Sequence, residues 1–500
     1  MACVIGIDGG TESIRVHIFD LDGNCLGSSA AAYPTRFPQP GWAEQSPEDW
    51  WNALGTAMHA AMAEAEVDPR SVSALSLATT SCTVVMLDSA GQPIAPALLW
   101  MDVRASREAE VVRQARDGLG PSARNIHGPV SAEWMLPKAL WLRQHWSQAF
   151  RHCHTLCEYQ DYMVHRLTGR MVASLNTASI RWHYDIETGG APRDMLQALD
   201  FSDLLDLWPR EVLRPGEPVG RLTAAAAAFL GLAPDVLVVQ GGADAFVGMI
   251  GAGVNQPGQV ALISGSSHLQ LAVSDKRMNI PGLWGSYAEA VYPGRHIVEG
   301  GQSASGSMVA WLSRLIGCAQ DLDRLNREAA LLPPGSDGLV VLDHFQGGRS
   351  PNTDAASRGA IVGLSLAHTQ AHLFRAAIEA VCLGTEAVLD TMRHGLPVSS
   401  LTVVGGATRS PLWLQIHADV AGLPIRVPAI TEGPGIGAAI LAATGAGHFD
   451  DIDAGIARMV RIARTIEPDP GHHATYQKLF ADYFSLYPAL RAWRLERKSA

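Results

Sequence analysis

The sequence predicts an α/β protein that is built from two related domains. Its 500 residues exceed what one hydrophobic core usually serves, so two domains are expected. A strand–turn–strand pattern at residues 4–20 recurs in altered form at residues 259–273. Around these hairpins, β-branched runs alternate with amphipathic stretches, which is the pattern of an α/β fold.

The first hairpin has small and polar residues in and beside its turn. Two β-branched strands flank a segment that contains Gly9, Gly10, Thr11 and Ser13. Glycine lets the backbone turn sharply and approach a ligand closely. The turn N–H groups and hydroxyls can then cradle phosphate oxygens. Asp8, just before the turn, is placed to hold a phosphate-bound magnesium ion. Because the turn opens into a strand, neither the Walker nor the dinucleotide glycine pattern fits. An ordinary hairpin turn is the alternative.

Composition limits the partners and the compartment. The chain has a net charge of −11, with 47% hydrophobic and 17% charged residues. No basic run stands out, which argues against nucleic acid and anionic membranes as partners. No stretch is apolar enough to cross a bilayer, and no signal-peptide pattern is evident at the start. Seven scattered cysteines are typical of a reducing cytoplasm.

One cluster of metal-ligating residue types contains His152, Cys153, His154 and Cys157. No second pair at zinc spacing follows it. Buried thiols and a surface histidine are therefore preferred over a structural zinc site.

The elements of the first half can be placed in chain order. A third strand is expected near residues 25–32, and an amphipathic helix is expected from Ser46 or Pro47 to Glu66 after a proline-rich loop. The remaining elements are strands at 72–77, 84–87 and 97–100, a helix at 161–167 that ends at Gly169, a helix at 222–230, and a strand at 236–240 that enters Gly241-Gly242-Ala243-Asp244.

The second half begins with a strand–turn–strand hairpin like that of the first half. A glycine-rich helix at residues 246–253 precedes it, which places the domain boundary near residues 244–258. The recurrent hairpin has Ser264, Gly265 and Ser266 in its turn. Two phosphate-type turns that face one cleft would clamp one polyphosphate.

A third glycine turn, at residues 405–410, lies between a strand at 401–404 and a helix at 411–421 that begins with proline. A glycine pair there lets a flat ring approach the backbone, as an adenosine pocket requires, and a simple strand-to-helix loop is the alternative. Helices at 379–392 and 435–443 complete this half.

Five segments in order, at residues 6–11, 241–244, 263–267, 299–303 and 405–407, together resemble the FGGY carbohydrate kinases over essentially the whole chain. The resemblance implies an α/β fold of two ribonuclease H-like (actin-like ATPase) domains with an interdomain catalytic cleft. It assigns sugar binding and the first phosphate turn to residues 1–250, and nucleotide binding to residues 251–500. It also implies transfer of the γ-phosphoryl group of ATP to a sugar or polyol hydroxyl, with ATP and magnesium as cofactors, and it suggests a homodimer.

Within that family, the chain is most similar to ribulokinase-type members. Residues 79–83, 177–183, 299–304 and 345–351 carry this similarity, with Arg181 where ribulokinases send a lysine to the sugar. The guanidinium of arginine is planar and donates several hydrogen bonds in fixed directions, whereas the lysine ammonium is a single charge on a flexible side chain. The polyol that is bound can therefore differ. A ketopentose such as ribulose is the expected substrate. The alternatives are xylulose, ribitol or erythritol, and, in another class, a nonenzymatic actin-like ATP-binding regulator.

The resemblance also implies roles for single residues. Asp244 is the expected general base, because a carboxylate can accept the proton of the attacking hydroxyl late in the transfer. A helix-capping aspartate is the alternative for this position. Asp8 is the expected magnesium residue. The residues expected at phosphate and nucleotide are Gly10, Thr11, Glu12, Ser13, Arg15, Ser264, Gly265, Ser266, Gly306, Gly405, Gly406 and Ser410.

Carboxylates and arginine suit vicinal hydroxyls, and an aromatic face suits the carbon skeleton of a sugar. The residues expected at the sugar are Ser81, Trp100, Asp102, Arg104, Arg181, Asp244 and Glu299. Core packing is the alternative for Trp100, a surface ion pair for Asp102 and Arg104, and a solvent-facing side chain for Arg15.

Overall fold

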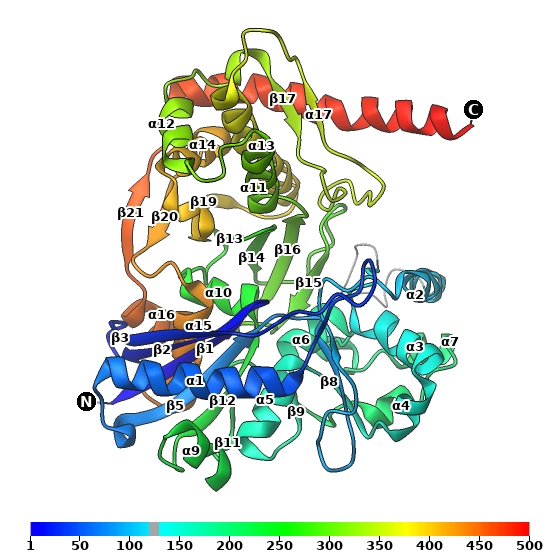
Figure 1. The fold of residues 1–500 in the computed structure, drawn as a ribbon, viewed down its shortest axis with the longest axis vertical. Coiled ribbons are helices and arrows are strands. Elements are labelled where there is room, and N and C mark those ends of the chain that lie inside the picture. The colour runs from blue at the N-terminus through cyan, green and yellow to red at the C-terminus, as the bar shows by residue number, and fades with distance from the viewer. Residues whose placement is uncertain (1, 120–129, 500) are drawn as a thin grey trace.

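Two open β-sheets form the frame of the computed structural model, which describes residues 2–119 and 130–499 (Figure 1). The strands of the first sheet are β1 (Cys3–Gly9), β2 (Ser13–Asp20), β3 (Cys25–Ala32), β5 (Val72–Thr79), β11 (Pro218–Arg221) and β12 (Leu237–Ala243). Those of the second are β13 (Gly258–Ser264), β14 (His268–Ser274), β15 (Gly285–Ala288), β16 (His296–Gln302), β19 (Val398–Gly405), β20 (Ile425–Pro428) and β21 (Ile462–Ile466).

The two sheets repeat one topology. The first has the order β11-β12-β5-β1-β2-β3, and the second has the order β15-β16-β14-β13-β19-β20-β21. The core of each sheet consists of three neighbouring antiparallel strands, β1-β2-β3 or β13-β14-β16, and of two strands on the other side of the first one, β5 and β12 or β19 and β20, that run parallel to it. Strands β11, β15 and β21 add antiparallel edges. The two predicted hairpins, β1–β2 and β13–β14, hold equivalent places. The predicted recurrence of one α/β unit is therefore confirmed.

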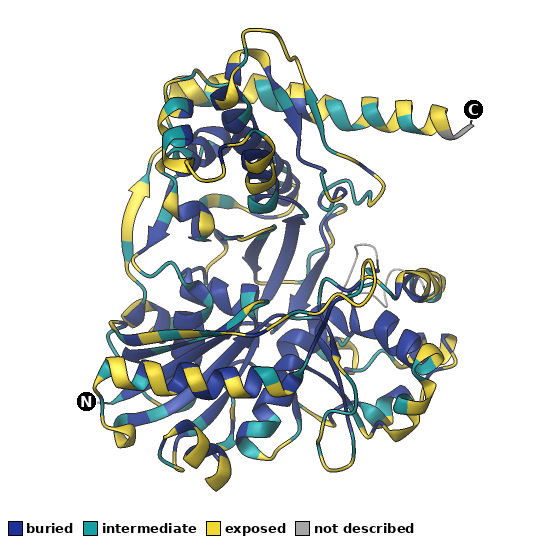
Figure 2. Ribbon diagram, viewed as in Figure 1, coloured by how far each residue is buried: buried dark blue, intermediate teal, exposed yellow. Residues whose placement is uncertain are grey.

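Some helices pack against the two sheets, and others pack against one another beside them (Figure 1). In the first half they are α1 (Pro47–Ala65), α2 (Ser106–Gly118), α3 (Met135–His145), α4 (Ser147–His152), α5 (Tyr159–Thr168), α6 (Leu175–Arg181), α7 (Arg193–Ala198), α8 (Leu204–Leu207), α9 (Ala224–Leu230) and α10 (Asp244–Gly251). In the second half they are α11 (Gly306–Leu315), α12 (Leu322–Ala330), α13 (Gln370–Arg393), α14 (Pro411–Ala421), α15 (Gly433–Gly445), α16 (Ile452–Met459) and α17 (Pro470–Ser499). The central strands of both sheets are buried, whereas the edge strands β3 and β21 are partly exposed, as Figure 2 shows.

Three small sheets complete the fold. One contains β4 (Glu44–Gln45), β7 (Ala97–Leu98), β6 (Val84–Leu87) and β8 (Thr155–Glu158), in that order. The others pair β9 (Val172–Ser174) with β10 (Glu211–Leu213), and β17 (Val340–Leu342) with β18 (Ala360–Val362). The strand predicted at 97–100 is wrong in length, because the chain turns after Leu98 and the Asp102 N–H donates to the Leu99 carbonyl.

The halves meet through the two central helices, α10 and α15. Helix α15 also packs against β1 and β5 of the first sheet, and thus belongs to both halves of the core. Glycines make these contacts close. A Cβ at Gly437 would lie 2.0 Å from the Val247 carbonyl oxygen, and one at Gly251 would lie 2.1 Å from that of Gly433. Backbone therefore packs on backbone where the halves join.

Replacing Gly6 with Ala should lower the free energy of unfolding by about 1–3 kcal/mol or more, because overpacking forces backbone shifts. A Cβ at Gly6 would lie 1.9 Å from the carbonyl oxygen of Gly435 in α15. Urea unfolding followed by circular dichroism measures the change. Gly118→Ala is the control, since a Cβ there meets nothing within 4 Å and alanine favours the helix. An equal effect of both changes would contradict the close contact.

The four metal-ligating residue types at 152–157 do not form one cluster. Cys153 and Cys157 are buried, His154 is exposed, and the His152 ring bonds to the Gln148 carbonyl. Among the residues that the model describes, no three His, Cys, Asp or Glu side chains are grouped to hold a metal ion. Within residues 2–119 and 130–499, no helix combines the length and the apolar character that crossing a bilayer needs.

Candidate active site

The first hairpin carries one ion pair next to its glycine turn. Asp8, the last residue but one of β1, faces Arg15 across the hairpin, with 2.8 Å between Oδ2 and Nη1. Asp8 is buried, whereas the Arg15 side chain is 41% exposed. Burial raises the pKa of Asp8, and the Arg15 guanidinium opposes this shift. Arg15 therefore has an ion-pair partner on the hairpin and also presents surface to a ligand.

The rest of this turn is held by neighbours. The Gly10 N–H donates to the Ser13 carbonyl at 3.0 Å. The Trp100 indole N–H donates to the Thr11 hydroxyl at 3.0 Å. Glu12 is exposed, and its carbonyl accepts from the Tyr33 N–H. The structure thus brings together the predicted phosphate turn and Trp100, which was predicted at the sugar.

Asp244 directly follows β12. It begins α10, two residues earlier than the predicted helix, and its Oδ1 accepts from the Ala245 N–H at 2.7 Å. The Asn176 side chain holds the preceding N–H, that of Ala243, at 2.8 Å. Burial and the charge of Asp8 raise the pKa of Asp244 to about 7, against the Ala245 N–H and Arg15. A pKa near the working pH is suited to a group that exchanges protons.

The second glycine turn packs against the third. Ser264 is buried, its Oγ lies 3.0 Å from His268 Nε2, and this oxygen accepts from the Ala407 N–H at 3.2 Å. Gly265 and Ser266 are exposed. Ser264 therefore anchors the third turn, while the next two residues present backbone and hydroxyl to the cleft.

The other predicted nucleotide residues surround this anchor. Gly405 has a φ of 88°, and a Cβ there would lie 2.3 Å from the Ser264 carbonyl oxygen, whereas Gly406 is exposed. A Cβ at Gly306 would lie 2.5 Å from the Gly265 carbonyl oxygen. Ser410 caps α14 through the Trp413 N–H and bonds to Asn326. The three predicted nucleotide segments thus form one surface.

A buried ion pair connects the halves at the predicted sugar site. Arg181, at the end of α6, donates to both carboxylate oxygens of Glu299 on β16, at 2.7 and 3.0 Å. The Tyr287 hydroxyl donates to the same carboxylate at 2.7 Å. The Arg181 guanidinium carbon lies 5.3 Å from the ring centre of Trp284. Figure 1 shows β15 and β16 reaching toward α6, where this pair lies.

Asp102 and Arg104 form a second ion pair, with both side chains fully buried. Arg104 also bonds to Glu44 and lies 3.8 Å over the Trp42 ring, and the Ala43 N–H donates to Asp102. The alternative of a surface pair is therefore wrong. These contacts fasten the loop that precedes α1, whereas Ser81 is half-buried in its own turn.

A cleft of about 770 Å³ lies between the halves. Trp100, Met101 and Glu133 line it from the first half, and Ser266 and Trp284 line it from the second.

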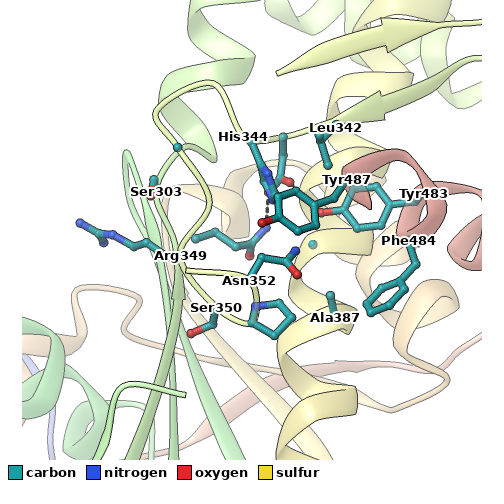
Figure 3. Close-up of a pocket in the computed structure, with 15 residues that line it drawn as sticks. Ser303, Leu342, His344, Arg349, Ser350, Asn352, Ala387, Tyr483, Phe484 and Tyr487 are labelled. Atoms are coloured by element: carbon teal, nitrogen blue, oxygen red, sulfur yellow. Dashed lines mark hydrogen bonds between the residues drawn. The ribbon is translucent and has the colours of Figure 1, made fainter. Parts of the chain in front are cut away.

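The sequence did not single out Glu133, Trp284 or Tyr287. Arg349 lies within the ribulokinase-like run at 345–351, and it reaches to 3.8 Å from Glu133 across this cleft and stacks on Trp284. Arg349 also lines, with Tyr483, a pocket of about 20 Å³ in the second half, and Figure 3 shows the Arg349 guanidinium pointing away from Tyr483. That pocket has room for one water molecule.

Two repeated α/β domains, each with a glycine-containing turn at the cleft between them, define two actin-like ATPase domains. The models of the FGGY family of carbohydrate kinases match this chain, the N-terminal domain at residues 3–251 and the C-terminal domain at residues 260–446. The chain belongs to this family. It is a sugar kinase that uses ATP as phosphate donor.

The proteins that are similar to this chain include ribulokinases and xylulose kinases. A ribulokinase of Geobacillus thermodenitrificans is 29% identical, over 97% of this chain and 94% of its own. A xylulose kinase of Staphylococcus epidermidis is also 29% identical, over 97% and 96%. The crystal structure of a xylulose kinase from Rhodospirillum rubrum superposes with a TM-score of 0.85 at 28% identity, over 98% of this chain and 99% of that one.

Proposed function

We propose that the chain phosphorylates a small ketose, with ribulose as the first candidate. The observation that carries this proposal is that Asp244 lies close to Asp8, while Arg181 of the Arg181–Glu299 pair contacts Trp284, which lines the interdomain cleft. Arg181 stands at the lysine position of ribulokinases, so xylulose, ribitol or erythritol is the alternative. The names of the relatives include both ribulokinase and xylulose kinase, which supports a pentulose.

In the proposed reaction, the sugar hydroxyl attacks the γ-phosphorus of ATP, the bond to the β-phosphate oxygen breaks, and Asp244 accepts the hydroxyl proton. Phosphoryl transfer mainly needs positioning and charge stabilisation. Thr11 and Arg15 position the phosphates from residues 1–250, and the turn at Gly265 and Ser266 does so from residues 251–500. Closure of these two domains would exclude water as a competing acceptor.

Asp8 is proposed to hold magnesium. Magnesium prefers oxygen ligands and is commonly bound by one or two carboxylates together with substrate phosphates. Asp8 offers a carboxylate beside the first phosphate turn, and Asp244 lies close enough for the two charges to interact. These donors fit the ion. When bound, magnesium supplies charge neutralisation to the transferring phosphoryl group.

A substrate panel tests the proposed function. ADP formation should depend on added ketose and should be fastest with ribulose among ribulose, xylulose, ribitol and erythritol. The measurement is coupled ADP release at saturating ATP. Faster turnover with a polyol would replace the ketose assignment. If no sugar in the panel increases ADP release, the nonenzymatic ATP-binding regulator would be favoured.

A further inference from the structure

Two buried charged residues outside the predicted site converge on the segments that carry it. Glu158 ends β8 and is the N-cap of α5, Lys138 lies in α3, and neither side chain is exposed to solvent. Burying a charge is costly unless hydrogen bonds compensate it. Both side chains direct their hydrogen bonds to the neighbours of predicted sugar residues.

The first target is the peptide backbone of Cys82, next to Ser81. Cys82 has a φ of 63°, which is left-handed and unfavourable for a residue with a side chain. Its N–H donates to Glu158 Oε2 at 2.9 Å, and its carbonyl accepts from Lys138 Nζ at 2.7 Å. This residue is therefore held on both sides in a conformation that it would otherwise leave.

Two further hydrogen bonds reach the segments that contain Arg181 and Trp100, the other two residues predicted at the sugar. Glu158 Oε1 accepts from the indole N–H of Trp182 at 2.7 Å, and Trp182 directly follows Arg181. Lys138 Nζ also donates to the Leu99 carbonyl at 2.5 Å, and Leu99 directly precedes Trp100.

We propose that Glu158 and Lys138 are positioning residues that fix Ser81, Trp100 and Arg181 relative to one another for sugar binding. This inference rests on the proposed function. It predicts that losing the carboxylate of Glu158 weakens sugar binding more than ATP binding, because the Asp8–Arg15 ion pair and the bond from the Ala407 N–H to Ser264 hold the phosphate turns through other residues.

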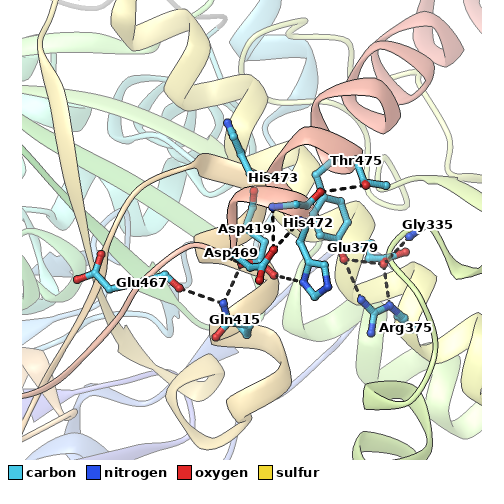
Figure 4. A network of polar contacts seen from close by, with 12 residues as sticks. Gly335, Arg375, Glu379, Gln415, Asp419, Glu467, Asp469, His472, His473 and Thr475 are labelled. Carbon is cyan, nitrogen blue, oxygen red and sulfur yellow. Dashed lines mark hydrogen bonds and ion pairs between the residues drawn. The ribbon is translucent and has the colours of Figure 1, made fainter.

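The test compares two buried glutamates. Glu158→Gln should raise the KM for the preferred ketose about tenfold, the effect of losing one hydrogen bond to a charged group, and leave the KM for ATP unchanged. Glu379 is the matched control, because it is buried in the second half and bonded to Gly335, Arg375 and Tyr476 (Figure 4). Glu379→Gln should lower thermal stability without changing the ketose KM.

A second measurement needs no folded Glu158 variant. Burial raises the pKa of Glu158 to about 7, against the hydrogen bonds from Trp182 and Cys82 and the charges of Lys138 and Arg181; Asp161 also faces it. Below that pH, one acceptor oxygen carries a proton. The dissociation constant of the ketose should therefore rise as pH falls through about 7. Calorimetry on the Asp244→Asn variant measures this without titration of the proposed base.

Each outcome decides between the two proposals. If wild-type ADP formation does not respond to any sugar, the proposed function fails and this inference fails with it. If wild-type turnover responds to sugar, a ketose KM that is unchanged in both Glu158→Gln and Lys138→Met overturns the positioning role alone. Where those variants do not fold, sugar binding to Asp244→Asn that is independent of pH overturns it.

Discussion

Replacing Asp244 with Asn should lower kcat by on the order of 10²- to 10⁴-fold, the contribution of a positioned general base. The KM values for sugar and ATP should change little, because asparagine keeps the size of the side chain and the Ala245 N–H bond to its oxygen. Steady-state ADP release with saturating substrates measures the change. Asp482→Asn, on the exposed face of α17, is the control. Equal turnover of Asp244→Asn and wild type would reject Asp244 as the base.

The same residue predicts the acid limb of the pH profile. A base must be ionised, and burial together with Asp8 raises the pKa of Asp244 to about 7. The rate should therefore rise with pH up to this value and level off above it. A cation bound at Asp8 removes one of the two causes, so it should move the midpoint to lower pH. A rate that stays constant from pH 5 to 8 would contradict the assignment.

Replacing Arg181 with Met should lower the free energy of unfolding by about 3–5 kcal/mol, the usual cost of breaking a buried ion pair. Glu299 would remain buried, and the Tyr287 hydroxyl would still donate to its carboxylate. Sugar-dependent turnover should also be lost, because the guanidinium that is proposed to bind the sugar is gone. Urea unfolding and ADP release measure the two effects.

The double variant Arg181→Met with Glu299→Leu separates stability from binding. Replacing a buried pair with apolar residues is often neutral or stabilising. Most of the stability lost in Arg181→Met should therefore return, while sugar-dependent turnover should stay absent. A single variant as stable as wild type would show that the pair does not connect the two halves as described.

Local sequence patterns were sufficient for the frame of the fold. The hairpins at the start of each half follow from β-branched runs around glycine turns, and both are confirmed. The helix at 411–421 is also confirmed; it could be predicted because proline opens it and glycine follows its end. The 30-residue helix α17 was missed, and the sequence offered no clear single face for it.

The predicted site needed contacts that a sequence does not contain. Arg181 and Glu299 are 118 positions apart, and no local pattern indicates that they pair. In the sequence, Glu158 and Lys138 resemble ordinary charged residues in or next to a helix, and only the tertiary structure shows that they are buried. Asp102 and Arg104 resemble an exposed pair because the covering loop, at Trp42 and Glu44, lies far from them in sequence.

The contact between α10 and α15 has a consequence for when the enzyme reacts. Asp244 is the first residue of α10, and at Gly251 and Gly437 this helix meets α15 with backbone against backbone. In shear motions, packed helices shift relative to one another at contacts of this kind. We expect Asp244, the proposed general base, to move together with α10. Domain closure would then also bring Asp244 into position, so that the γ-phosphoryl group of ATP is transferred only when sugar has brought the halves together.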